Sequence, residues 1–132
     1  MKLILSVLTF VFLNASNCSS DSHFKEIKFG QGGGFTGAVT EYHLRENGDI
    51  YKYNAVEKEE LLIKSITAEE LKTVKEKLAK VPKESLNINH PYNVYYFIKI
   101  DTMNAVWGDP SFTIPKELED LYNYLNATAT KK

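Results

Sequence analysis

The sequence predicts an α+β fold in which an antiparallel sheet of about five to six strands carries two helices on one face. Turn signals join successive strand-like runs, and strands joined by hairpins are antiparallel. Two separate stretches carry apolar residues at helical spacing, and each needs a surface on which to bury its apolar stripe. With 132 residues and ordinary apolar and charged fractions, the chain has room for one domain.

The N-terminus is typical of an export signal. Lys2 precedes a largely apolar run from Leu3 to Leu13. This run is too short to cross a bilayer core of about 30 Å, so a signal peptide fits it better than a membrane anchor. We expect a signal peptide over residues 1–17 and a flexible tether over residues 18–22.

Cys18, the one cysteine of the chain, stands directly after this segment. Residues 13–18 resemble the signal of bacterial lipoproteins, in the loosened form found in those of the Bacteroidetes. The resemblance implies that Cys18 is acylated and that the protein is a membrane-anchored lipoprotein of the cell envelope, on the periplasmic side or at the cell surface. The alternative is ordinary cleavage, which would leave a free thiol on a secreted protein.

The first half of the domain reads as strands joined by turns. Ile27 and Phe29 alternate with charged residues, which predicts a strand over residues 23–29. After a glycine segment, we expect a second strand over residues 35–44. Asn47-Gly48 is a strong hairpin signal and predicts return strands over residues 50–53 and then 61–66.

The second half predicts two helices around a hairpin. Thr67 to Glu70 is a capping-box sequence, which opens a helix that Pro82 ends. Residues 83–91 read as an irregular loop, and strands are expected over residues 92–101 and 105–107. From Pro115, leucines recur at helical spacing as far as Leu125, which predicts a closing helix. We assign residues 23–126 to a single domain and residues 127–132 to a polar tail.

The glycines between Gly30 and Gly37 give the clearest indication of a site. Glycine loses more backbone freedom on folding than other residues, so a cluster needs a local reason such as positive φ or close backbone approach. Large aromatic side chains beside flexible backbone concentrate binding energy at protein interfaces, and the alternative is that they belong to the core. The predicted binding site comprises Gly32, Gly33, Gly34, Phe35, Thr36, Gly37 and Trp107.

Catalytic, cofactor and nucleic-acid sites have little support. The G-x-G-x-x-G pattern of residues 32–37 opens a strand, whereas a dinucleotide site needs a helix N-terminus there. Glu41 and His43 share a strand face and could form an acid–imidazole pair, but two ligands are too few for a metal site. We expect no catalytic residue, metal or cofactor. Arg45 is the sole arginine and the lysines alternate with acids, so no nucleic-acid partner is expected.

One family resemblance follows from these motifs. The strand opening Gly33-Gly34-Phe35-Thr36-Gly37, with Ile114-Pro115 and the helical leucines after it, resembles the emfourin family of protealysin inhibitors. Those are small bacterial inhibitors of thermolysin-like metallopeptidases. The resemblance covers most of residues 24–125 but not the export signal, the long connection at residues 54–60 or the segment 108–112. The G-G-G-F-T-G and W-G-D-P stretches are also similar to Bacteroidetes lipoproteins of unassigned activity.

We therefore expect an exported, lipid-anchored binding module that is not an enzyme. Its partner would be a protein, and the resemblance implies a metallopeptidase. Two alternatives stay open, namely a small metal-dependent hydrolase built on Glu41 and His43 and a structural lipoprotein of the envelope.

Overall fold

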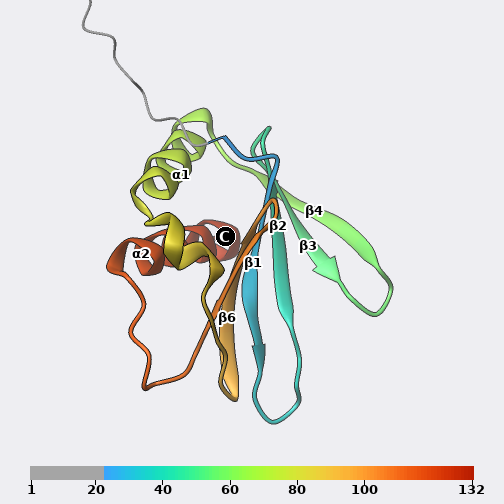
Figure 1. The fold of residues 1–132 in the computed structure, drawn as a ribbon. Coiled ribbons are helices and arrows are strands. Elements are labelled where there is room, and N and C mark those ends of the chain that lie inside the picture. Colours follow the sequence, from blue (N-terminus) through green and yellow to red (C-terminus); the bar gives the residue numbers. More distant parts are fainter. Residues whose placement is uncertain (1–22) are drawn as a thin grey trace, which may run out of the picture.

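The structure, a computed structural model, describes residues 23–132 and has the predicted α+β class. The predicted signal peptide, the tether and Cys18 therefore lie outside the described residues, whereas the whole predicted domain lies within them. Figure 1 shows the arrangement of the elements. In chain order these are β1 (Glu26–Gly33), β2 (Thr40–Arg45), β3 (Asp49–Asn54), β4 (Glu59–Ser65), α1 (Ala68–Lys80), the 3-10 helix η1 (Lys83–Asn87), β5 (Asn89–His90), β6 (Val94–Ile100), β7 (Met103–Trp107) and α2 (Lys116–Thr130).

Within residues 23–132, one sheet contains all seven strands, in the order β4-β3-β2-β1-β6-β7-β5. Neighbouring strands are antiparallel except β5 and β7, which are parallel, so the sheet is mixed. It has seven strands, one more than the largest number expected from the sequence. The additional strand, β5, pairs Asn89 with Val106 and His90 with Trp107. It lies in the stretch predicted to be irregular, because two residues are too few to show a period.

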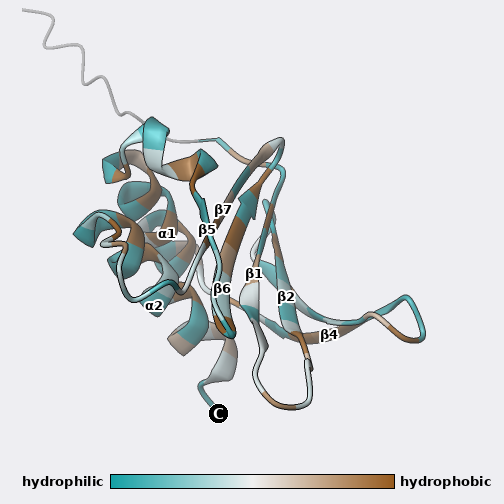
Figure 2. Cartoon of the chain, turned by 60° about the horizontal axis from the view of Figure 1, so that its bottom comes forward, coloured by the Kyte–Doolittle hydropathy of each residue, from teal (hydrophilic) through white to brown (hydrophobic). Residues whose placement is uncertain are grey.

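Both helices pack on the same face of the sheet, as Figures 1 and 2 show. The alternation predicted for β1 is confirmed, since Ile27 and Phe29 are fully buried on the helix side. Their neighbours on β2 and β6 are apolar as well, and the helices contribute the opposite wall of this core. The helical core residues are Val74, Leu78, Leu118, Leu121, Leu125 and Ala129.

The start of α1 is the one that the sequence predicts. The Thr67 hydroxyl oxygen accepts from the main-chain N–H of Glu70 at 3.1 Å, and the Glu70 carboxylate accepts from the main-chain N–H of Thr67 at 3.3 Å. This capping box satisfies two amides that have no partner inside the helix. The helix ends at Lys80, two residues before Pro82.

The predicted polar tail over residues 127–132 is wrong for most of its length. α2 continues to Thr130, and Thr128 and Ala129 are buried, so the domain extends well beyond residue 126. The reason is a contact with a distant strand: the Lys64 ammonium of β4 donates to the carbonyl oxygens of Thr128 at 2.8 Å and Lys131 at 3.2 Å. A cation at a helix C-terminus satisfies free carbonyls and complements the helix dipole.

The glycine segment also differs from the prediction, because β1 continues through Gly33 and β2 begins only at Thr40. Gly30 lies in the sheet between β2 and β6, and Gly32 pairs with β6 alone. A Cβ on Gly30 would lie 1.9 Å from the Thr40 carbonyl oxygen, and one on Gly32 would lie 2.5 Å from the Tyr95 hydroxyl. Close approach by the main chain of β2 thus explains Gly30, whereas the close neighbours of Gly32 are the side chains of Tyr95 and Val39. The loop itself is confined to residues 34–39.

Candidate functional site

The β1–β2 loop stands at the end of the sheet and has a fixed turn at its base (Figure 1). Gly33, Gly34 and Gly37 have φ of +88°, +78° and +66°, values that other residues rarely adopt. The Gly34 amide donates to the Asn93 carbonyl at 2.6 Å, and the Gly37 amide donates to the Gly34 carbonyl at 3.2 Å. The turn therefore holds Phe35 and Thr36 at the tip of the loop.

Phe35 is completely exposed, with a relative accessibility of 109%. The alternative that Phe35 belongs to the core is therefore wrong. A phenylalanine normally contributes to folding by burying its ring, and this ring has no such role. A solvent-exposed aromatic on a turn that glycines hold in place is a feature of binding surfaces.

Further apolar side chains are exposed at this end of the molecule, and none of them was singled out from the sequence. Val39 is the last residue of the loop, while Tyr92 and Val94 flank Asn93, whose carbonyl accepts from the Gly34 amide. The strand predicted over residues 35–44 would have placed Val39 within the sheet. Its exposure depends on the late start of β2, which local sequence does not show.

A notch of about 800 Å³ separates residues 37–39 from the β3–β4 hairpin. Figure 1 shows this hairpin diverging from the β1–β2 hairpin. Exposed apolar side chains lie on both walls, with Val39 on one and Val56 and Leu61 on the other. The charged residues that line the notch are Lys52, Glu57, Glu59 and Glu60.

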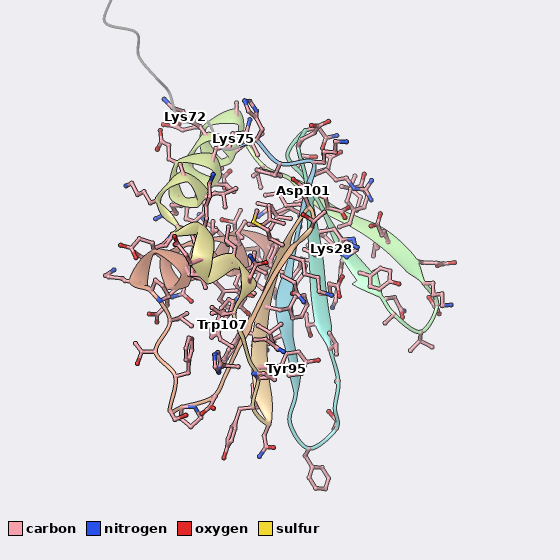
Figure 3. The ribbon with its side chains drawn as sticks, in the orientation of Figure 1. Lys28, Lys72, Lys75, Tyr95, Asp101 and Trp107 are labelled. Atoms are coloured by element: carbon pink, nitrogen blue, oxygen red, sulfur yellow. The ribbon has the colours of Figure 1, made fainter. Side chains whose placement is uncertain are left out.

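Trp107, the remaining member of the predicted site, lies elsewhere. It is on the helix side of the sheet (Figure 3), where its ring packs edge-on against Tyr122 of α2 at 5.2 Å between centroids. Its relative accessibility is 9%, so it is a core residue and not part of the loop. The Tyr122 hydroxyl donates to the Gly30 carbonyl at 3.1 Å. Burial raises the pKa of Tyr122 to about 12, and Tyr96 and Tyr42 make smaller contributions in the same direction.

Glu41 and His43 do meet, on the sheet face that the helices leave open. The His43 ring is almost fully buried and stacks on Tyr53 with 5.1 Å between ring centroids. Its Nε2 lies 2.6 Å from Glu41 Oε1, and its Nδ1 lies 2.5 Å from Glu60 Oε1. Glu60 of β4 joins the pair from across β3 as a third group, which the sequence does not indicate.

Arg45 completes this cluster. Its Nε donates to Glu26 Oε2 at 3.0 Å, and its Nη2 donates to Glu60 Oε2 at 2.5 Å. Burial raises the pKa of Glu60, but the hydrogen bonds from His43 and Arg45 lower it more, so the pKa lies below its ordinary value. The carboxylate of Glu60 is thus held ionised between an imidazole and a guanidinium.

The cluster has the outline of a cation site, since Glu26, His43 and Glu60 offer ligand atoms within 4.8 Å of one another. However, Arg45 already donates to both carboxylates, and both ring nitrogens of His43 lie within hydrogen-bond distance of carboxylates. A metal ion would have to replace these contacts. The geometry is that of an ion-pair network that braces β1, β2 and β4.

The G-x-G-x-x-G pattern covers the end of β1 and the loop, and β2 rather than a helix follows it. Across residues 23–132, no helix is both long and apolar enough to cross a membrane. Comparison of the chain with protein-family models, curated proteins and solved structures gave no match. The emfourin and lipoprotein resemblances therefore stay predictions.

Proposed function

We propose that this protein is a non-enzymatic binding module that inserts the tip of its β1–β2 loop into a protein partner. The observation that carries the proposal is the full exposure of Phe35 on a turn set by Gly34 and Gly37. Aromatic anchors supply much of the binding energy of protein interfaces when a pocket on the partner receives them. A turn that is already fixed loses little conformational entropy on binding.

The resemblance to the emfourin family supports a thermolysin-like metallopeptidase as the partner. Five of the residues that carry it, Gly33 to Gly37, form the turn and its tip. In this proposal the loop enters the substrate cleft of the peptidase and blocks it, and Phe35 fills an apolar subsite. The remainder of the domain holds the loop in position.

The position of the loop is consistent with the proposed lipid anchor at Cys18. The described chain begins beside α1, and β1 then leads away from it to the loop at the other end of the sheet (Figure 1). At about 3.3 Å per residue, a strand of this length separates its ends by roughly 25 Å. A domain tethered through its N-terminus would therefore present the loop away from the membrane.

Inhibition of a thermolysin-like metallopeptidase tests the proposal. We expect the protein to inhibit such an enzyme, and Phe35→Ala to raise the inhibition constant at least tenfold. The melting temperature should not change, because the ring makes no core contact. Leu62→Ala, an exposed apolar residue of β4 outside both loop and notch, is the matched control and should inhibit normally. Equal inhibition by Phe35→Ala would contradict the proposal.

One observation favours a second candidate, a metal-dependent hydrolase. It is the convergence of Glu26, His43 and Glu60. Metal analysis of the purified protein separates the two functions, because a hydrolase of this kind would contain a stoichiometric metal ion that is lost on His43→Ala. We favour the binding module, since Arg45 supplies the positive charge that these carboxylates require.

A further inference from the structure

The notch between residues 37–39 and the β3–β4 hairpin is a second point of contact. We propose that it binds an extended segment of the partner in which apolar residues alternate with basic ones. This inference rests on the proposed function in one respect, namely that the partner is a protein. It assigns a separate surface, with its own chemistry, and does not involve Phe35.

The first wall offers main-chain groups that the fold leaves free. β2 pairs with β1 from Thr40 onward, and its last pair with β3 joins Glu41 to Tyr53. In the described chain, no main-chain hydrogen bond forms to the carbonyl of Ala38 or to the N–H and carbonyl of Val39. An extended peptide can pair with such groups in the manner of an added strand.

The side chains of the notch indicate that this peptide carries apolar residues. Val56 and Leu61 of the hairpin have relative accessibilities of 92% and 69%, and Val39 opposite them has 46%. These three side chains come from two different hairpins and line the same notch. Covering them would remove apolar surface from water at about 25 cal/mol per Å².

The charges of the notch indicate the polar residues of the peptide. Three carboxylates and one ammonium line it, and one net negative charge remains once Glu60 is discounted as the partner of Arg45. Glu60 is engaged by His43 and Arg45, so Glu57 and Glu59 are the carboxylates available to a ligand. Carboxylates beside the apolar side chains of the two walls are complementary to lysine or arginine placed between apolar residues.

The hairpin wall is ordered without a ligand. The Asn54 side-chain carbonyl accepts from the amides of Val56 at 3.0 Å and Glu57 at 3.2 Å, which fixes the turn. Lys58 completes it with φ of +55°. The wall is thus formed in the free protein, and binding does not have to order it.

Titration with two synthetic peptides tests the inference. One is a seven-residue peptide in which valine alternates with lysine, and the other has glutamate in place of each lysine. With ¹⁵N-labelled protein and NMR detection, we expect the lysine peptide to shift the amides of Ala38, Val39 and residues 56–61. The glutamate peptide should bind at least tenfold more weakly. Absence of binding by the lysine peptide, or shifts confined to other residues, would overturn the inference.

Two sets of variants show whether the notch and the loop act separately. The double variant Glu57→Gln, Glu59→Gln should reduce the preference for the lysine peptide to less than threefold, and Leu61→Ser should weaken its binding at least fivefold. Both changes lie at exposed positions, so the melting temperature should be preserved. An unchanged preference in the double variant would refute the charge argument.

Phe35→Ala should still bind the lysine peptide with wild-type affinity while it loses inhibition of the peptidase. Failure of inhibition alone would therefore remove the proposed function and leave the notch as a peptide site. Failure of the peptide titration alone would remove the notch and leave the loop. Loss of peptide binding in Phe35→Ala would contradict the separation of the two surfaces.

Discussion

Glu60 is one residue through which pH acts on this fold. It bonds to His43 and Arg45, and the net effect of its surroundings lowers its pKa below the ordinary value of 4.5. A carboxyl group with a lowered pKa in the folded state stabilises the protein at pH values above its unfolded pKa. That contribution is lost as the pH falls through the folded value.

We therefore predict that part of the acid sensitivity of the protein belongs to Glu60. Glu60→Gln should lower the free energy of unfolding by about 1 kcal/mol at pH 7, because two charge-assisted hydrogen bonds are lost at a partly exposed site. Below pH 4.5 the variant and the wild type should converge in stability. Urea unfolding between pH 7 and pH 3 measures this, with the exposed Glu59→Gln as the matched control. A constant difference between Glu60→Gln and wild type at all pH values would contradict it.

Two glycines of the same segment should respond differently to alanine. At Gly30 an added Cβ would lie 1.9 Å from the Thr40 carbonyl, within a sheet that cannot yield easily, so Gly30→Ala should destabilise by at least about 2 kcal/mol. At Gly37 an added Cβ meets nothing within 4 Å, and only the positive φ opposes it, at about 1 kcal/mol. Urea unfolding of both variants gives the comparison, and equal losses would show that close approach is not the reason for Gly30.

The elements differ in how far the sequence determines them. The capping box before α1, the Asn-Gly turn and the helical leucines of α2 act over a few residues, so they could be read locally. β5 and the end of α2 depend on distant partners, β7 and Lys64, and have no local signal. The end of β1 was predicted too early, because its glycines were interpreted as a loop. Glycine within a strand depends on its neighbours in the sheet, here Thr40 and Tyr95, which the local sequence does not show.

The candidate site was predictable in part for the same reason. Phe35 and the glycines of positive φ stand together in the chain, so their grouping indicated a binding site, although residues 35–37 were expected to begin a strand. The notch combines residues 37–39 with Val56 and Leu61. These residues line one notch only because of how the two hairpins are arranged in the folded sheet, which the sequence does not show. The link from His43 to Glu60 likewise needs the register of three strands.

The last turn of α2 should depend on one lysine of β4. Removing the ammonium with Lys64→Met keeps the apolar stem but leaves the carbonyls of Thr128 and Lys131 without this donor. We expect the free energy of unfolding to fall by about 0.5–1 kcal/mol, the usual stabilisation by a cation at a helix C-terminus. Hydrogen exchange should accelerate at the amides of residues 127–131 and not in α1. Unchanged exchange in α2 would show that packing of Thr128 and Ala129 alone holds this turn.

At the scale of the whole molecule, the start of the described chain and the β1–β2 loop lie at opposite ends of the sheet (Figure 1). The proposed lipid attachment and the proposed binding by the loop should then be independent of each other. The core of the described domain is formed by side chains of residues 23–132 alone. A change that abolishes attachment should leave both the fold and the loop intact.

Cys18→Ser tests this separation. If Cys18 is acylated, the wild-type protein should partition into the membrane fraction and incorporate labelled fatty acid, and the variant should do neither, since the acyl chains supply the membrane affinity. The variant should nevertheless melt at the wild-type temperature and inhibit the peptidase equally, because the loop is roughly 25 Å from the start of β1. Retention of the variant in the membrane fraction would exclude the lipid anchor. Loss of inhibition in a variant that melts normally would instead show that the loop depends on the N-terminal attachment.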